Sequence, residues 1–122
     1  MANVINWFQI PVTDFNRARI FYEKLFNHTL YEMMMEQMQM GFFPMEGDGV
    51  GGAIVKGEGA IASPHGTLVY INAGKDLNDF LERIEPAGGK ILVPKTLITP
   101  EIGYFALFSD TEGNTVGLHS LS

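Results

Sequence analysis

The stretch that decides the fold is residues 4–26, which read VINWFQIPVTDFNRARIFYEKLF. Its first part, Val4 to Val12, is apolar and partly alternating, which is typical of a β-strand. Thr13 and Asp14 then offer side-chain oxygens that can cap a helix. The spacing predicts a helix over residues 15–26, because apolar side chains recur there at steps of three and four residues. That stripe consists of Phe15, Ala18, Tyr22 and Leu25.

The rest of the chain repeats this order of elements. Strands are predicted over residues 30–35, 38–44 and 52–55, and after the linker over residues 66–73, 90–93, 104–109 and 115–120. A second helix follows Asp76 and is predicted to end near Glu85, because Pro86 cannot donate a backbone hydrogen bond. Asp14-Phe15-Asn16 matches Asp76-Leu77-Asn78, 62 residues later, which indicates two strand–helix–three-strand units. Each such unit exposes one face of its sheet, so two units must cover these faces or curve around a shared space. A concave sheet is a typical binding site for a small molecule.

Length and composition restrict the class of protein. The chain has 122 residues, enough for one domain with a packed core, and 46% of them are hydrophobic. Eight Lys and Arg against fourteen Asp and Glu give a net charge of −6, and no basic cluster occurs, so we expect no nucleic-acid partner. Because there is no cysteine, disulfides and thiolate metal sites are excluded and any classical metal site must use His, Glu or Asp.

No signal or membrane segment is apparent in the sequence. The N-terminus lacks a basic patch followed by an apolar run, and no apolar stretch approaches the roughly 20 residues that span a bilayer. We therefore expect a cytoplasmic protein that has no membrane partner.

Several motifs together resemble the vicinal oxygen chelate superfamily of glyoxalase, bleomycin-resistance and extradiol dioxygenase proteins. The anchors are IPVTDF at residues 10–15, FYEKLF at 21–26, AGGK at 87–90 and FALFSDTEGN at 105–114. The resemblance covers essentially the whole chain. It implies an α+β fold of two tandem βαβββ modules, residues 1–57 and 66–122 with a linker at 58–65, which form a U-shaped, partly open barrel-like sheet. It also implies frequent homodimers and, in many members, a divalent metal held by one residue from each of four strands.

The residues at the four implied metal positions are not metal donors. Three positions fall on Trp7, Leu68 and Gly117, and the fourth lies within residues 52–56, which contain no acid or imidazole. We therefore predict no cofactor and no four-residue metal site. A displaced divalent-metal site stays open as the alternative, because His119 and Gln9 each lie two residues past one of these positions.

Strand alternation predicts one wall of a ligand cleft. Because successive side chains of a strand point to opposite faces, Trp7 and Gln9 share one face, and Phe8 and Ile10 share the other. On the equivalent face of the second half we expect Leu68, Tyr70 and Asn72 from its first strand, together with His119 from its last strand. This wall is aromatic and amide in character, which suits a flat or apolar molecule, although ordinary core filling is the other interpretation. His119 is the candidate catalytic residue, as an acid, base or hydrogen-bond donor, against a simple structural role at the strand end.

Three further segments carry weaker signals. Six of the seven methionines lie between Met33 and Met45, which indicates either an adaptable ligand lining or gap filling and dimer packing along this hairpin. Residues 47–52 formally match GxGxxG, but a strand follows rather than a helix, so we interpret the glycines as a mobile loop. Residues 95–103 are predicted to form a loop bordered by Glu101 and Tyr104.

The sequence thus predicts a metal-independent protein that binds a small hydrophobic or aromatic molecule in a concave cleft and forms a homodimer. Whether it is an enzyme stays undecided. The alternative is a metal-dependent glyoxalase-like lyase or isomerase, or a dioxygenase, with a displaced site. A third hypothesis is an interaction protein that uses its methionine-rich hairpin.

Overall fold

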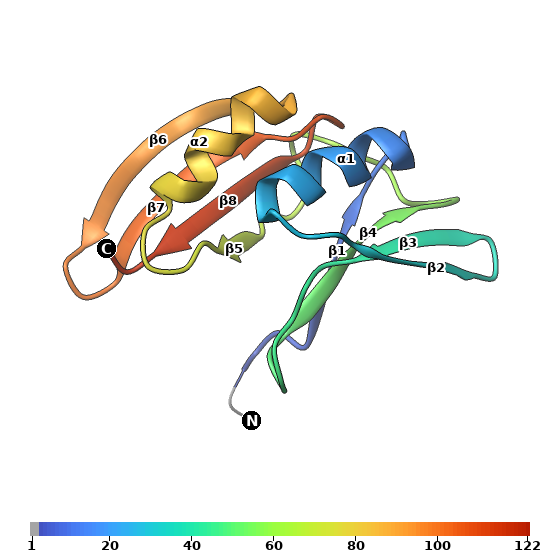
Figure 1. Cartoon of the computed structure of the whole chain (residues 1–122), viewed down its shortest axis with the longest axis horizontal. Helices are drawn as coiled ribbons and strands as arrows, with labels where there is room; N and C mark the ends of the chain where they lie inside the picture. The colour runs from blue at the N-terminus through green and yellow to red at the C-terminus, as the bar shows by residue number, and fades with distance from the viewer. Residues whose placement is uncertain (1–2) are drawn as a thin grey trace.

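Two halves of the chain repeat one order of elements in the computed structural model, which describes residues 3–122 (Figure 1). The first half contains β1 (Trp7–Pro11), α1 (Phe15–Phe26), β2 (Tyr31–Met35), β3 (Met38–Phe42) and β4 (Gly51–Lys56). The second half contains β5 (Tyr70–Asn72), α2 (Asn78–Ala87), β6 (Lys90–Thr99), β7 (Gly103–Ser109) and β8 (Thr115–Ser120). The predicted α+β fold of two βαβββ modules is confirmed.

Each half forms its own four-stranded sheet with the same pairing. The strand orders are β1-β4-β3-β2 and β5-β8-β7-β6, so the first strand of each half pairs in parallel with the last strand of that half. The other neighbours are antiparallel. The two helices lie side by side over one side of both sheets, and the sheets diverge on the other side without closing into a barrel (Figure 1).

One hydrophobic core fills the space between the helices and the two sheets. The predicted stripe of α1 is confirmed, since Phe15, Ala18, Tyr22 and Leu25 are all buried. The helices meet through Phe26 and Phe80, whose ring centroids are 5.4 Å apart in an edge-to-face arrangement. Both sheets contribute to the same core, with Ile10 and Ile54 from the first and Ile71, Phe108 and Leu118 from the second.

The first strand of each half, β1 or β5, is shorter than predicted, because it pairs with only a short length of its partner strand. The strand predicted over residues 4–12 is regular only over β1, which pairs with β4 from Trp7 opposite Gly51 onward. The strand predicted over residues 66–73 is reduced to β5. Its partner β8 begins at Thr115, just after a turn, so residues before Tyr70 have little strand to pair with.

The predicted loop over residues 95–103 is wrong, because β6 continues to Thr99 and only a tight turn separates it from β7. The prediction ended the strand before Pro94. β6 is an edge strand, where a missing N–H is tolerated, and the register shifts along it accommodate the irregularity.

The second helix also runs further than predicted. α2 includes Pro86 in its last turn and ends at Ala87, since the left-handed Gly88 and the following Gly89 donate to the carbonyls of Glu85 and Ile84. The predicted cap Asp76 lies two residues before the helix, and its Oδ1 accepts from the Asn78 amide at 2.9 Å. By contrast, Asp14 caps α1 as predicted and accepts from the Arg17 amide.

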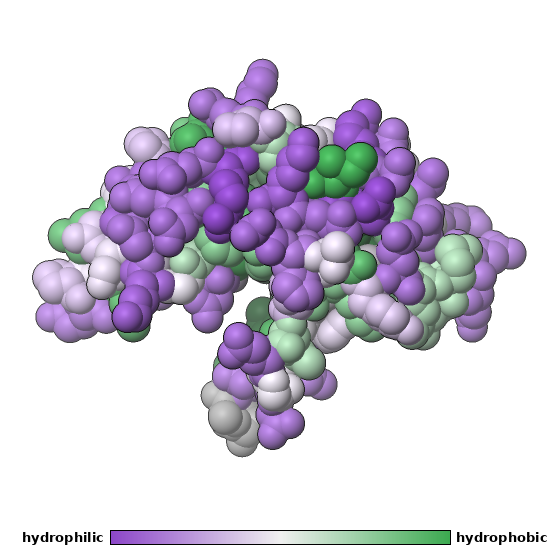
Figure 2. Space-filling model, in the orientation of Figure 1, coloured by the Kyte–Doolittle hydropathy of each residue, from purple (hydrophilic) through white to green (hydrophobic). Residues whose placement is uncertain are grey.

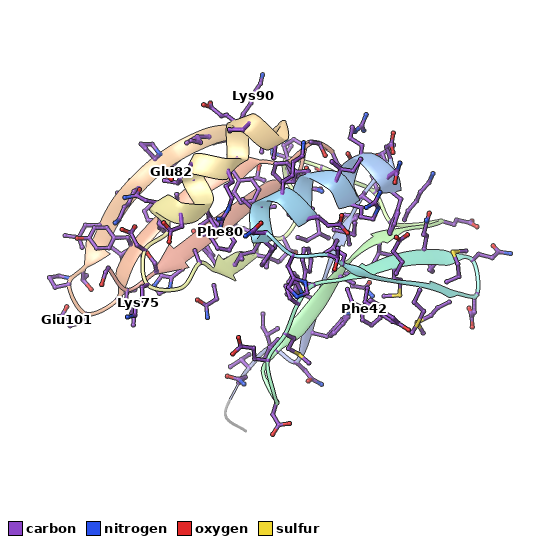
Figure 3. The ribbon with its side chains drawn as sticks, in the orientation of Figure 1. Phe42, Lys75, Phe80, Glu82, Lys90 and Glu101 are labelled. Atoms are coloured by element: carbon purple, nitrogen blue, oxygen red, sulfur yellow. The ribbon has the colours of Figure 1, made fainter. Side chains whose placement is uncertain are left out.

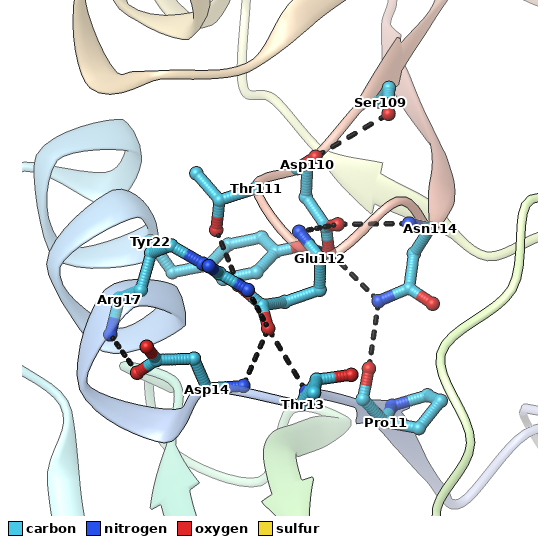
Figure 4. A network of polar contacts seen from close by, with 10 residues as sticks. All are labelled: Pro11, Thr13, Asp14, Arg17, Tyr22, Ser109, Asp110, Thr111, Glu112 and Asn114. Carbon is cyan, nitrogen blue, oxygen red and sulfur yellow. Dashed lines mark hydrogen bonds and ion pairs between the residues drawn. The ribbon is translucent and has the colours of Figure 1, made fainter.

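A carboxylate of the second half binds the start of α1 in the first half (Figure 4). Glu112 accepts hydrogen bonds from the amides of Thr13 and Asp14 at 3.0 and 2.7 Å and from Arg17 Nε at 2.8 Å, and its side chain has no exposed surface. Burial by itself raises the pKa of Glu112, but the hydrogen bonds from Arg17, Asp14, Thr111 and Thr13 outweigh it and lower the pKa from 4.5 to about 2. The carboxylate therefore stays charged and holds the two halves together.

A second set of hydrogen bonds beside it is buried. Tyr22 donates its hydroxyl to Asp110 at 2.7 Å, and burial next to that carboxyl raises the pKa of Tyr22 well above 10. Asn114 donates from Nδ2 to Asp110 and to the carbonyl of Pro11 (Figure 4). It also accepts a hydrogen bond from the Ser63 amide. These bonds join α1, β1, the linker and the β7–β8 turn in one network, which we call the inter-half network and which includes Glu112.

Candidate functional site

The first sheet has one face against the helices and one face turned away from them. Gly41 marks the helix-side face, because a side chain there would meet Phe15, Leu30 and Ile54. Residues alternate along a strand, so Met40 and Phe42 lie on the opposite face, which we call the concave face. Figure 3 shows Phe42 on the side of the first sheet away from α1, with sulfur atoms along the β2–β3 hairpin.

A cavity of about 480 Å³ opens on this concave face. It is lined by Trp7, Gln9, Met35, Glu36, Met38, Met40 and Phe42. Trp7 meets Phe42 edge to face at 5.5 Å between ring centroids. The lining is thus two aromatic rings and three thioethers with one amide and one carboxylate, and the volume lies in the range of small-molecule sites.

A second cavity of about 400 Å³ lies where the two halves meet. It is lined by both sides of β1, by the linker around Ile61 and Ser63, and by the start of β8 at Thr115 and Val116. Trp7 and Gln9 border both cavities. Figure 2 shows the surface recessed between the second half and the part of the first half that projects away from the helices.

The six predicted site residues fall into two groups. Trp7 and Gln9 lie on the first sheet and line the cavities. Tyr70 and Asn72 pair with Gly117 and His119 across β5 and β8, which puts them on the concave face of the second sheet, and Leu68 precedes β5 as a partly exposed side chain. The structure therefore brings Tyr70, Asn72 and His119 together, and it places Trp7 and Gln9 on the other sheet.

Strand register shows that the two groups are counterparts. Trp7 lies opposite Gly51 in the first half, and Tyr70 lies opposite Gly117 in the second. A Cβ built on either glycine would come within 3.2 Å of Trp7 Cζ3 or 2.5 Å of Tyr70 Cδ2, so each ring covers its glycine. Two residues further along, each half has an amide, Gln9 or Asn72. The aromatic–amide pair is therefore repeated like the fold.

His119 makes a short contact on the second sheet. Its Nε2 lies 2.6 Å from the carbonyl oxygen of Ile102, which can only accept, so Nε2 carries the proton in this contact. In a neutral ring, Nδ1 is then the nitrogen that can accept a proton. The other two histidines lie elsewhere, His28 after α1 and His65 in the linker. The role of His119 in catalysis stays a prediction.

The four positions that the family resemblance assigns to a metal do not suit one in this chain. Trp7 and Leu68 carry no donor atom for a cation, and Gly117 lies under the Tyr70 ring, which occupies the space that a longer side chain would need. Within β4, residues 52–56 supply no carboxylate or imidazole. In residues 3–122, no three His, Asp or Glu side chains are grouped so that they could share a metal ion.

Five of the residues that line the first cavity are not among the six predicted site residues. These are Met35, Glu36, Met38, Met40 and Phe42, all from the β2–β3 hairpin. The signal was the group of six methionines between residues 33 and 45, which left ligand lining and packing open as alternatives. Only the strand register decides which methionines share a face with Trp7.

The fold and the repeated concave faces define the class of proteins built from paired βαβββ modules. The family model described as Glyoxalase/Bleomycin resistance protein/Dioxygenase superfamily matches residues 4–118, and the chain belongs to this superfamily. A "Glyoxylase-like domain-containing protein" from Didymella fabae is 31% identical over 119 residues, which cover 91% of this chain and 88% of that protein.

Solved structures show the same fold. TnmS3, described as an antibiotic binding protein from Streptomyces sp. CB03234, is 25% identical with a TM-score of 0.65, covering 100% of this chain and 99% of that one. Glyoxalase I from Zea mays has a TM-score of 0.68 at 18% identity, and the match covers 94% of this chain but 43% of the maize chain. A superfamily enzyme from Burkholderia phytofirmans PsJN has a TM-score of 0.67 at 13% identity, covering 96% and 98% of the two chains.

Neither helix in the described part of the chain has the length and apolarity needed to cross a membrane.

Proposed function

We propose that this protein binds a small apolar or aromatic molecule on its concave surface, without the four-residue metal site of many superfamily members. The observation that carries the proposal is the cavity of about 480 Å³ between Trp7, Phe42 and the hairpin methionines. Aromatic rings give a flat ligand a large contact area, thioethers adapt to its shape, and the Gln9 amide fixes its orientation. The likeness to TnmS3, which is described as antibiotic binding, supports a binding role for this chain.

The predicted second-sheet residues belong to the same proposal. Tyr70, Asn72 and His119 lie on the concave face of their sheet, and Leu68 is partly exposed beside it. A ligand longer than the first cavity would extend from Trp7 toward these residues across the recess between the halves. His119 would then donate or accept a hydrogen bond to a polar group of the ligand.

We further propose that the protein is a cytoplasmic homodimer. Tyr31 and Met34 are large hydrophobic side chains of the edge strand β2, each with about two thirds of its surface exposed, and a second copy that pairs with this edge could cover both. Sedimentation equilibrium is the direct measurement, and a monomer at every concentration would overturn this part of the proposal.

Titration with Nile red, a neutral aromatic dye, tests binding, because its fluorescence rises when it leaves water. We expect saturable binding at one site per chain, and we expect Trp7→Ala to lower the affinity strongly while the far-ultraviolet circular dichroism stays unchanged. Binding that is equally strong in folded Trp7→Ala would contradict the site.

The competing function is that of a metal-dependent lyase, isomerase or dioxygenase with a displaced site near His119. The purified protein is therefore assayed with α-ketoaldehyde–thiol adducts and catechols, with and without added Ni, Zn, Mn or Fe. Turnover that needs one of these metals and is lost in His119→Gln would replace the binding proposal with the enzymatic one.

A further inference from the structure

Four methionines of the β2–β3 hairpin share one face, and the proposed function uses three of them, Met35, Met38 and Met40, only as apolar lining. The register places Met33 opposite Met40 and Met35 opposite Met38. Residues two apart on a strand point to the same side, and residues directly opposite in an antiparallel pair do too. All four thioethers therefore form a two-by-two group on the concave face, which we call the methionine square.

The helix-side face of the same hairpin has a different composition. It holds Glu32, whose carboxylate lies 3.8 Å from Arg19 of α1, together with Gly41 over the core. Met34 and Gln39 are the second opposite pair on this face. Met34 is thus a methionine of the same strand that points away from the methionine square.

The spacing within the square suits a shared ion. Cβ atoms of directly opposite residues in an antiparallel pair lie about 4.5–5.5 Å apart, and each methionine has three rotatable bonds beyond its backbone. Sulfur atoms from neighbouring corners can therefore converge on one small cation. Met40 is nearly buried at 7% exposure, whereas Met33 and Met35 are 37% and 50% exposed, so the square has a fixed base and an accessible rim.

Strand propensity does not favour methionine at these places, although Met38 and Met40 also pack beside Gly57, Ala53 and Val55. Methionine is not among the residues that strands favour, and valine or isoleucine would give a stiffer apolar face. Thioether sulfur differs from these side chains in being a soft ligand, and among metal ions it selects Cu(I). Glu36 lines the same cavity as Met35, Met38 and Met40, and the chain carries a net charge of −6, so the surroundings favour a cation.

We propose that Met33, Met35, Met38 and Met40 form a binding site for a soft monovalent cation, Cu(I). This site uses sulfur from one hairpin and is independent of the four strand positions that the superfamily uses for divalent metals. It goes beyond the proposed function, because it requires no organic ligand and no residue of the second half.

Silver(I), which has the same ligand preference and no redox chemistry in air, is the probe. The full chain, labelled with carbon-13 at the methionine methyl groups, is titrated with Ag(I) in chloride-free buffer and followed by calorimetry and NMR. We expect one Ag(I) per chain, with the methyl signals of the methionine square shifted and that of Met34 unmoved. No binding, or binding that shifts histidine signals and leaves these four methyl groups in place, would overturn the proposal.

Leucine variants test the sulfur atoms while keeping the apolar volume. We expect the double variant Met35→Leu/Met38→Leu to bind Ag(I) at least tenfold more weakly than the wild type. Met34→Leu, on the opposite face of the same strand, is the matched control and should bind Ag(I) as the wild type does. Equal Ag(I) affinity in the double variant and the control would overturn the proposal.

The failure of this site and the failure of the proposed function are distinguishable in the wild-type protein. Nile red is titrated without silver, and Ag(I) is titrated without the dye. Dye binding without Ag(I) binding would support the proposed function and overturn the cation site. Ag(I) binding without dye binding would support the cation site and overturn the proposed function. Trp7→Ala should keep its Ag(I) affinity, and a large loss in the folded variant would place the ion at the indole instead of the sulfurs and overturn the site.

Discussion

Trp7 over Gly51 in the first half and Tyr70 over Gly117 in the second occupy equivalent places in two copies of one fold. Around Trp7 the neighbouring hairpin supplies long, flexible methionines and a cavity remains. Around Tyr70, Phe105 of β7 meets the ring edge to face at 6.5 Å between centroids, as Phe42 of β3 meets Trp7 at 5.5 Å. The second half contains no methionine. The comparison teaches that the shared backbone gives each half a concave face with a pair of aromatic rings, whereas the outer strands of each sheet decide which side chains lie beside that pair.

The two halves also differ in how their helices begin. α1 begins with the side-chain cap of Asp14 and receives Glu112 from the other half. α2 begins without a side-chain cap at Leu77, whose amide donates to Ser120 Oγ of its own half at 3.0 Å. The start of α1 is therefore held by a residue of the other half, whereas the start of α2 is held by Ser120 of its own half.

The largest expected effect comes from removing the Glu112 carboxylate that holds the start of α1. Glu112→Ala leaves the amides of Thr13 and Asp14 without their acceptor, and we expect it to lower the free energy of unfolding by about 2–3 kcal/mol. Urea denaturation followed by circular dichroism measures this loss. The matched control is Glu82→Ala on α2, outside the inter-half network, and an equal loss in both variants would contradict the assigned role of Glu112.

The same carboxylate predicts a pH dependence. Because the pKa of Glu112 is lowered from 4.5 to about 2 on folding, its contribution is complete above pH 4.5 and is lost as the pH falls toward 2. Wild-type stability should therefore decrease over this window more steeply than the stability of Glu112→Gln, which has no carboxyl to protonate. Parallel slopes for the two proteins in acid denaturation would argue against the lowered pKa.

The next largest effect distinguishes dye binding at the concave face of the first sheet from dye binding at the concave face of the second sheet. Trp7→Ala removes a ring from the first cavity, and we expect roughly thirtyfold weaker binding of Nile red, equivalent to about 2 kcal/mol of lost apolar contact. Tyr70→Ala should weaken binding much less, because the larger cavity is not lined by Tyr70. Equal losses in the two variants would show that both halves hold the dye equally.

A smaller effect is expected at the buried hydrogen bond between the halves. Tyr22→Phe keeps the ring in the core and removes the donor to Asp110, which should lower the free energy of unfolding by about 1–2 kcal/mol. Thermal denaturation at neutral pH measures the change. A variant as stable as the wild type would mean that Asn114 and the nearby amides satisfy Asp110 without the tyrosine.

The smallest effect concerns the hairpin turn beside the first cavity. Glu36 holds a left-handed backbone with φ of 55°, which a glycine adopts without steric cost. We expect Glu36→Gly to raise the free energy of unfolding by less than about 1 kcal/mol, measured by urea denaturation. Lys56→Gly, in a strand where φ is negative, is the control and should be destabilising.

The sequence by itself determined the fold. The apolar stripe of α1 and its cap at Asp14 are visible in residues 4–26, because helix periodicity and capping are local properties. The repeat of that unit along the chain then indicated two modules. The aromatic and amide pairs Trp7 with Gln9 and Tyr70 with Asn72 were also visible, since alternation along a strand is local.

Only the tertiary structure decided how these local units are joined and where the cavity lies. Asp110 and Asn114 border the short β7–β8 turn, but their bonds to Tyr22 and Pro11 connect positions about ninety to a hundred residues apart in the chain. β6 continues past Pro94 because it lies at the edge of its sheet, and edge position is a property of the whole sheet. Likewise, four methionines share a face because of the strand register, which depends on pairing between strands and not on the order of residues within either one.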